Sequence, residues 1–150
     1  MSPQAMPTIP PDSLLKTWLT IEQAAVQHLS RNGTPFAVAA SLIHLHVHPE
    51  AAEPAQLADA LVIPRQSMTF TIDALERSQL AVRQSHPADR RKKIIVLTAK
   101  GKKEAKKTLE DLLLFEERAF SSFTQDELKT FRLMLIKLMT GLPQLNTKGV

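Results

Sequence analysis

Two short helices in close succession limit the fold more than any other pattern in the chain. Pro54 and Pro64 each stand where a helix can begin, since proline fits the first helical position but not the interior. Apolar residues then recur at helical spacing, in the second segment as far as about Arg77. Because so few residues separate the two helices, the pattern predicts a helix-turn-helix.

The spacing of apolar residues changes after residue 79. Segments 80–85 and 94–97 have the length and composition of two short strands, and the polar stretch 86–93 connects them. Half of that connection is Lys or Arg. We therefore expect a hairpin with a cationic tip, which makes the whole unit, at about 54–98, a winged helix-turn-helix.

Further helices are expected on both sides of this unit. Asp12 stands where the first of them needs an N-cap, and Thr98 can cap a long helix after the hairpin. Thr124 and Glu127 have the spacing of a capping box before the last helix. The predicted fold class is therefore mainly α (α+β), a winged helix-turn-helix with flanking helices. The flanking helices are expected at about 12–31, 35–48, 98–121 and 124–141.

Length and composition limit the organisation of the chain. Its 150 residues suit one domain, which we expect at 12–142 between a flexible N-terminal segment, 1–11, and a C-terminal tail, 143–150. The absence of cysteine excludes a disulfide framework, thiolate catalysis and a Cys-ligated metal. No apolar run is long enough to span a bilayer and no export signal is present, so we expect a cytoplasmic protein with no membrane partner.

Positive charge is concentrated in one part of the chain. Residues 83–107 hold ten Lys and Arg against only Asp89 and Glu104. Such a block suits a polyanion, because each cation that meets a phosphate releases condensed counterions. A solvated surface is the alternative for an isolated basic run. Here the block coincides with the predicted wing, which favours double-stranded DNA as the partner.

The second helix of the helix-turn-helix supplies the first candidate contacts. Its N-terminal residues approach base edges when such a helix lies in the major groove. Arg65 can bond bidentately to guanine and Gln66 to adenine. The short hydroxyl side chains of Ser67 and Thr69 suit phosphate or either base.

The hairpin tip supplies the second set of candidate contacts. Arg90 and Arg91 suit a narrow minor groove, where the potential is strongly negative and guanidinium loses its water readily. Lys92 and Lys93 are expected to meet phosphates. Asp89 is expected to pair with a neighbouring arginine and fix the turn.

The hairpin also carries a longer motif. It reads Asp89-Arg90-Arg91, five residues, then Leu97-Thr98-Ala99-Lys100-Gly101. This resembles the wing signature of the MarR family of bacterial transcription regulators, Asp-x-Arg, five residues, Leu-Thr-x-x-Gly. The likeness extends to matching residues before the wing and, in helix order, to about 12–142. The matching residues before the wing are Leu57, Ala58, Leu61, Asp73 to Glu76, Leu80 and Arg83.

The resemblance carries expectations about function. It implies a homodimer whose first and last two helices form a shared dimerisation interface, at about 12–31 and 98–142. It also implies sequence-specific binding to a pseudo-palindromic operator, most often as a ligand-responsive repressor, with Arg91 as the minor-groove residue. Family members usually have Gly where Gln79 stands, and many have Arg where Phe70 stands. We therefore expect a strained or different turn at Gln79. At Phe70 we expect weaker or altered DNA binding, because a phosphate contact is lost.

The resemblance also implies an effector pocket between the dimerisation helices and the winged helix. Trp18, Phe36 and His44 are the candidates to line it, and a plain core role is the alternative for each. His44 and His48 share one helix face, which leaves a metal-responsive regulator as a further alternative. Two histidines do not complete a zinc site, so neither a metal nor another cofactor is expected.

An enzyme and a protein-interaction adaptor are the two other classes of function to compare with a regulator. An enzyme is not expected, because the sequence has no Ser/His/Asp set with suggestive spacing, no glycine-rich phosphate loop and no carboxylate pair in an apolar context. A winged-helix protein-interaction adaptor with weak DNA binding remains the alternative, since Phe70 and Gln79 depart from the family pattern.

Overall fold

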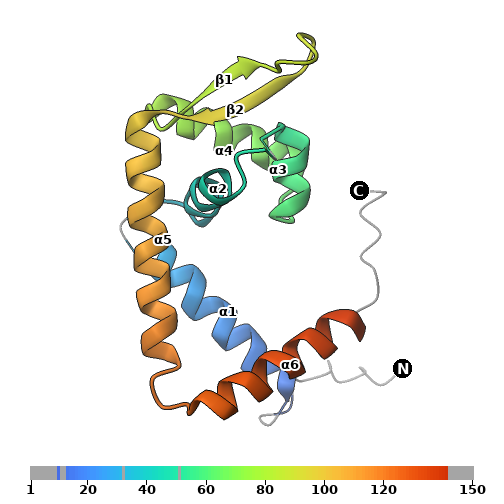
Figure 1. The fold of residues 1–150 in the computed structure, drawn as a ribbon, viewed down its shortest axis with the longest axis vertical. Coiled ribbons are helices and arrows are strands. Elements are labelled where there is room, and N and C mark those ends of the chain that lie inside the picture. Colours follow the sequence, from blue (N-terminus) through green and yellow to red (C-terminus); the bar gives the residue numbers. More distant parts are fainter. Residues whose placement is uncertain (1–9, 11–12, 32, 51, 142–150) are drawn as a thin grey trace, which may run out of the picture. The chain divides into compact units, whose positions relative to one another are not determined.

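A computed structural model describes residues 10, 13–31, 33–50 and 52–141. Apart from Pro10, the expected N-terminal segment lies outside the described residues, as do the expected tail and the expected cap Asp12. The elements occur in the predicted order (Figure 1). They are α1 Leu14–Ser30, α2 Phe36–Val47, α3 Pro54–Ala60, α4 Arg65–Arg77, β1 Ala81–Ser85, β2 Lys93–Leu97, α5 Ala99–Ala119 and α6 Gln125–Gly141. The chain forms two compact units, one ending at Leu113 and one beginning at Leu114.

The first unit contains a helix-turn-helix made by α3 and α4. Glu53 and Gln56 form a capping box at the start of α3, and Pro54 occupies its first turn. The turn between the helices places Val62 at φ 53°, in the left-handed region. A β-branched residue is strained there. The bond from Ile63 N–H to the Ala58 carbonyl, 2.9 Å long, closes this turn.

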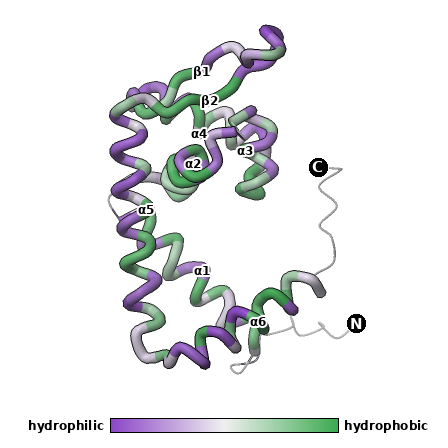
Figure 2. Tube along the Cα trace, viewed as in Figure 1, coloured by the Kyte–Doolittle hydropathy of each residue, from purple (hydrophilic) through white to green (hydrophobic). Residues whose placement is uncertain are grey.

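One hydrophobic core joins α2, the helix-turn-helix and the hairpin. The apolar face of α4 packs inward, with Met68, Ile72 and Leu75 at most 1% exposed. Removing these apolar surfaces from water is the main stabilising contribution. Figure 2 shows that α2 is largely hydrophobic, whereas the tip of the hairpin is hydrophilic. The core consists of Val38, Leu42, Leu45, Ala52, Leu57, Ala58, Met68, Ile72, Leu75, Ala81, Ile95, Leu97 and Ala105.

The hairpin is fixed at its base by three features. The antiparallel strands pair in a register that sets Ala81 opposite Leu97. The N–H of Ile95 also donates to the Ala52 carbonyl at 2.8 Å, which ties β2 to the segment before α3. At Gly101, in the first turn of α5, a Cβ would lie 1.8 Å from the Leu80 carbonyl oxygen. Glycine at this position therefore allows α5 to start against the hairpin.

The first and last helices, α1 and α6, are called the outer helices here. Unlike the helices of the core, neither of them has a buried residue. α1 begins at the N-cap Ser13, whose side chain accepts a hydrogen bond from the Leu15 N–H. At its other end, Arg31 and His28 bond to Asp111 of α5, with 3.2 Å between His28 Nε2 and Asp111 Oδ2. Large exposed side chains on α1 are Leu14, Leu15, Trp18, Leu19 and Ile21.

The second unit contains α6 and the turn before it. Thr124 and Glu127 form the predicted capping box, with 2.8 Å between Thr124 N and Glu127 Oε2. Before and within α6, the rings of Phe120, Phe123 and Phe131 lie within 6.2 Å of one another. Exposed large apolar side chains on α6 are Leu133, Met134, Ile136, Leu138 and Met139. No helix among the described residues is both long and apolar enough to cross a membrane.

Candidate nucleic-acid interface

The solvent face of α4 carries the first group of predicted contacts. Arg65, Gln66, Ser67 and Thr69 are all exposed in the first turns of the helix, whereas Met68 between them is buried. The helix begins after Pro64, which makes no side-chain cap bond. The positive end of the helix dipole therefore lies beside these side chains, which suits a phosphate group.

Arg65 is held only weakly within the protein. Its Nη2 atom lies 3.7 Å from Asp59 Oδ2, and the two side chains are 74% and 63% exposed. An ion pair this exposed contributes little, because water and salt screen it. The Thr69 hydroxyl donates to the Arg65 carbonyl at 3.2 Å, so its oxygen remains an acceptor. Arg65 can thus exchange Asp59 for a DNA partner at small cost.

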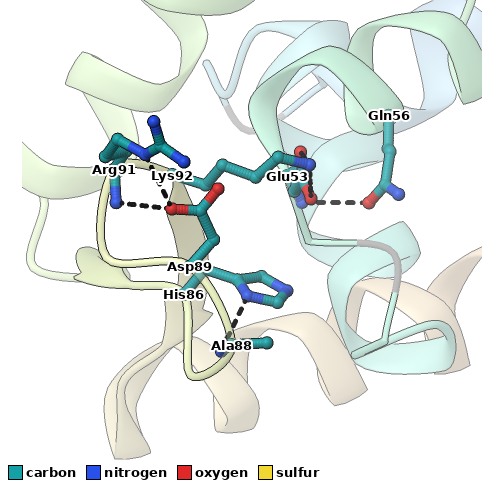
Figure 3. Close-up of polar contacts among 7 residues, drawn as sticks. All are labelled: Glu53, Gln56, His86, Ala88, Asp89, Arg91 and Lys92. Atoms are coloured by element: carbon teal, nitrogen blue, oxygen red, sulfur yellow. Dashed lines mark hydrogen bonds and ion pairs between the residues drawn. The ribbon is translucent and has the colours of Figure 1, made fainter.

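The turn at the hairpin tip is organised by Asp89 (Figure 3). Asp89 Oδ1 accepts a bond from the Arg91 backbone N–H at 3.0 Å and faces Arg91 Nε at 3.4 Å. The predicted pairing of Asp89 with a neighbouring arginine is therefore present. The Arg91 side chain is 93% exposed, and the pairing uses only Nε. Its two terminal nitrogens project from a braced turn and can still donate, and Arg90 is exposed beside it.

The two wing lysines have partners that sequence reasoning did not anticipate. Lys92 Nζ lies 3.0 and 3.2 Å from the two carboxylate oxygens of Glu53. Figure 3 shows the Lys92 side chain reaching toward Glu53. Glu53 also caps α3, so this contact joins the wing to the helix-turn-helix. Lys93 Nζ donates to the Ser85 hydroxyl at 3.1 Å. Each ammonium group has three N–H donors, so both lysines keep at least one for a phosphate.

Arg83 connects the hairpin to α4. From β1, its Nη2 atom lies 2.6 Å from Asp73 Oδ1, and its Nη1 atom bonds to Glu76, both on α4. Its backbone N–H also donates to Glu76 Oε1 at 2.9 Å. The hydrogen bond to Asp73 is the main cause that raises the pKa of Arg83. The sequence matched all three residues to the family pattern but did not indicate that they meet.

Gln79 stands where the family usually has glycine, and its backbone adopts the strained conformation that was one of the two expectations. Its φ is 60°, in the left-handed region. The left-handed conformation costs about 1–2 kcal/mol for a residue with a Cβ. Bonds around the turn hold it in place: the Leu80 N–H donates to the Leu75 carbonyl at 2.8 Å, and Thr98 Oγ1 donates to the Gln79 carbonyl at 2.8 Å. The turn that connects α4 to β1 is thus retained without glycine.

The predicted effector residues lie outside this surface. Trp18 on α1 is 52% exposed and Phe36 on α2 is 39% exposed, while His44 lies on α2 with its Nε2 atom buried and unbonded. Burial, and to a smaller extent His48, lowers the pKa of His44 against a weaker opposing effect of Glu50. Across the described residues, no group of three or more His, Asp or Glu side chains could hold a metal ion.

An exposed α4 and a braced hairpin tip define a winged helix-turn-helix protein. Residues 32–92 match the sequence model of the MarR family. The HTH-type transcriptional regulator MhqR of Bacillus subtilis is 30% identical over 91 residues, which are 59% of this chain and 60% of that protein.

Solved structures extend the likeness over most of the chain. The S. aureus MepR–DNA complex has a TM-score of 0.72 at 23% identity, covering 88% of this chain and 96% of that chain. The crystal structure of MarR has a TM-score of 0.68 at 26% identity, covering 89% and 94%. The match to the MarR family thus covers residues 32–92, and the likeness in fold covers most of the chain. The matched relative from B. subtilis is a transcriptional regulator, which agrees with the sequence-based expectation of a regulator and not an enzyme.

Proposed function

We propose that this protein regulates transcription by binding a pseudo-palindromic DNA operator as a homodimer. The observation that carries the proposal is the pairing of two exposed elements, the start of α4 and the hairpin tip. Arg65 to Thr69 would enter the major groove, and Arg91 the adjacent minor groove. Arg83 Nη2 of β1 lies 2.6 Å from Asp73 Oδ1 of α4, which links this helix to the hairpin so that both would meet DNA together.

The homodimer rests on the unburied apolar faces of the outer helices. Ile21 of α1 is 58% exposed, and Leu133 and Met139 of α6 are 61% and 70% exposed. Apolar surface repeated along whole helices favours burial against a partner. Under this proposal residues 12–142 form one MarR-type domain, in which these helices make the shared interface. Action on DNA would place the protein in the cytoplasm.

Repression relieved by a small molecule is the mode of action we propose. Half-sites one helical turn apart, about 34 Å, require both copies of α4 to fit at once. A ligand that changes their spacing by a few ångströms would therefore remove the contacts of one half-site. Trp18, Phe36 and His44 are our candidates for ligand contact, supported by the unbonded His44 Nε2. Titrating ligands that quench Trp18 fluorescence would test this part.

Selection from a pool of random DNA duplexes tests the main proposal. We expect the full-length protein to recover an inverted repeat with half-site centres about 10 base pairs apart. The same selection should be run in parallel with the Arg65→Ala and Arg91→Ala variants. It then shows which base positions depend on α4 and which depend on the wing. Failure to enrich any sequence would contradict the proposal.

A protein-interaction adaptor is the competing function, and the 65% exposure of Phe70 on α4 is the observation that favours it. The dependence of DNA affinity on salt separates the two. A dimer that neutralises several phosphates should lose affinity steeply as salt rises, because counterions are released on binding. An adaptor should show almost no dependence.

A further inference from the structure

Phe70 is an exposed aromatic side chain in the middle of α4. It is 65% exposed, whereas Met68 and Ile72 on either side of it are each 1% exposed. Helical geometry places Gln66, four residues earlier, on the same side as Phe70 and opposite the core. Phe70 therefore belongs to the surface that carries the candidate base contacts.

The surroundings of Phe70 do not suit a phosphate contact. Asp73 follows on the same side of the helix, and its carboxylate is bound by Arg83 at 2.6 Å. This ion pair neutralises an acid that would otherwise repel DNA, but it adds no positive charge for phosphate. Phe70, beside this ion pair, is apolar and cannot donate a hydrogen bond to a phosphate.

The major groove offers one apolar group to such a side chain. The C5-methyl group of thymine projects into the groove and distinguishes thymine from every other base by apolar contact. We propose that Phe70 is a specificity residue that packs against a thymine methyl in each half-site. The proposal rests on the proposed function, because it requires α4 to lie in the major groove.

Helix spacing places this thymine near the base read by Gln66. Four residues of α-helix rise about 6 Å, close to two base-pair steps of about 3.4 Å. We therefore expect the thymine within two base pairs of the adenine predicted for Gln66. Many family members have arginine where this chain has Phe70. Phe70 would thus replace a phosphate contact by a preference for thymine.

The test removes only the methyl group. Starting from the operator recovered by selection, each thymine is replaced in turn by deoxyuridine, and the affinities of the full-length protein and of Phe70→Ala are measured. At one symmetric pair of positions, wild-type affinity should fall about fourfold per half-site, as for loss of one buried methyl group. Phe70→Ala should bind the unmodified operator more weakly and show no further loss there. Phe70→Leu should keep part of the methyl preference.

The outcomes separate this inference from the proposed function. Equal sensitivity of wild type and Phe70→Ala at every thymine would overturn the methyl contact while leaving operator binding intact. If Phe70→Ala bound the operator as tightly as the wild type does, the proposed methyl contact would also be overturned. That result would point to a protein partner for Phe70. Failure of the wild type to select any operator would overturn both. Unchanged thermal unfolding of Phe70→Ala confirms that the variant folds.

Discussion

The winged helix and the outer helices use apolar residues in opposite ways. From α2 to β2, leucines such as Leu57 and Leu75 are fully buried, whereas α1 and α6 have no buried residue. Both regions show the same helical spacing of apolar residues in the sequence. The difference teaches that helical periodicity marks a face to be buried but does not say whether the same chain covers it. One region buries its apolar face within a single chain, and we propose that a second copy of the chain covers the other.

Adding a methyl group at two glycines should give the largest contrast between the regions. At Gly101 a Cβ would meet the backbone of Leu80, whereas at Gly141 it would meet nothing within 4 Å. We expect Gly101→Ala to lower the free energy of unfolding by roughly 5 kcal/mol, the upper end for single substitutions. Denaturant unfolding should show no loss for the control, Gly141→Ala. Similar curves for both variants would contradict the packing described here.

A core truncation should give the next largest effect. Leu75 is 0% exposed, so Leu75→Ala should lower the free energy of unfolding by about 3 kcal/mol through lost burial and a cavity. The loss should be independent of protein concentration. In dilute protein Leu133→Ala, at a side chain 61% exposed, should change stability by less than about 0.5 kcal/mol. A larger loss for Leu133→Ala than for Leu75→Ala in dilute protein would reverse the comparison.

Substitutions on the proposed DNA-binding surface should alter binding without altering stability. Arg65→Ala should cost roughly 1–3 kcal/mol at one base position and relax preference there. Arg91→Ala should weaken binding on all sequences and reduce its salt dependence. Fluorescence anisotropy with operator and mutated duplexes measures both effects. If the two variants weakened binding equally on every sequence, the assignment of Arg65 to base recognition would be wrong.

A charge on the outer helices should act on assembly alone. Met139 is 70% exposed, so Met139→Glu should leave the winged helix folded. In an apolar interface, however, an unpaired carboxylate is costly, and we expect the dimer dissociation constant to rise at least tenfold, or about 1.4 kcal/mol. Sedimentation equilibrium measures this constant, with Met139→Leu as the matched control. An unchanged constant would remove α6 from the interface.

The smallest effect should come from the cap of α6. Hydrogen bonds from the Thr124 backbone N–H, and secondarily from its hydroxyl, lower the pKa of Glu127 below its ordinary value of 4.5. A lowered folded-state pKa means that this stabilisation is present above the ordinary pKa and is lost as pH falls through the lowered one. Helix content followed by circular dichroism should therefore fall slightly more in acid for wild type than for Glu127→Gln. Identical acid titrations would argue against the charged cap.

Local signals explain why the elements could be predicted from the sequence. The observed bounds of α3, α4 and the strands lie within about a residue of the predicted ones, and the caps at Thr98 and Thr124 form as expected. These signals act over three or four residues, so one sequence suffices to see them. The exposed side chains of α4 followed from the same periodicity.

Contacts between distant segments could not be predicted in this way. Glu53 and Lys92 are 39 residues apart, and Arg83 meets acids seven and ten residues earlier on a different element. Nothing in the local spacing of these residues indicates that they meet, because only the packed core brings α3, α4 and the hairpin together. The left-handed Val62 also depends on this packing, since its type disfavours that conformation.

Sedimentation velocity with a labelled operator duplex, repeated over a series of salt concentrations, addresses the central claim most directly. We expect two chains per duplex, with an affinity that falls steeply as salt rises. A single chain that stays unbound to the duplex even at low salt would contradict the account.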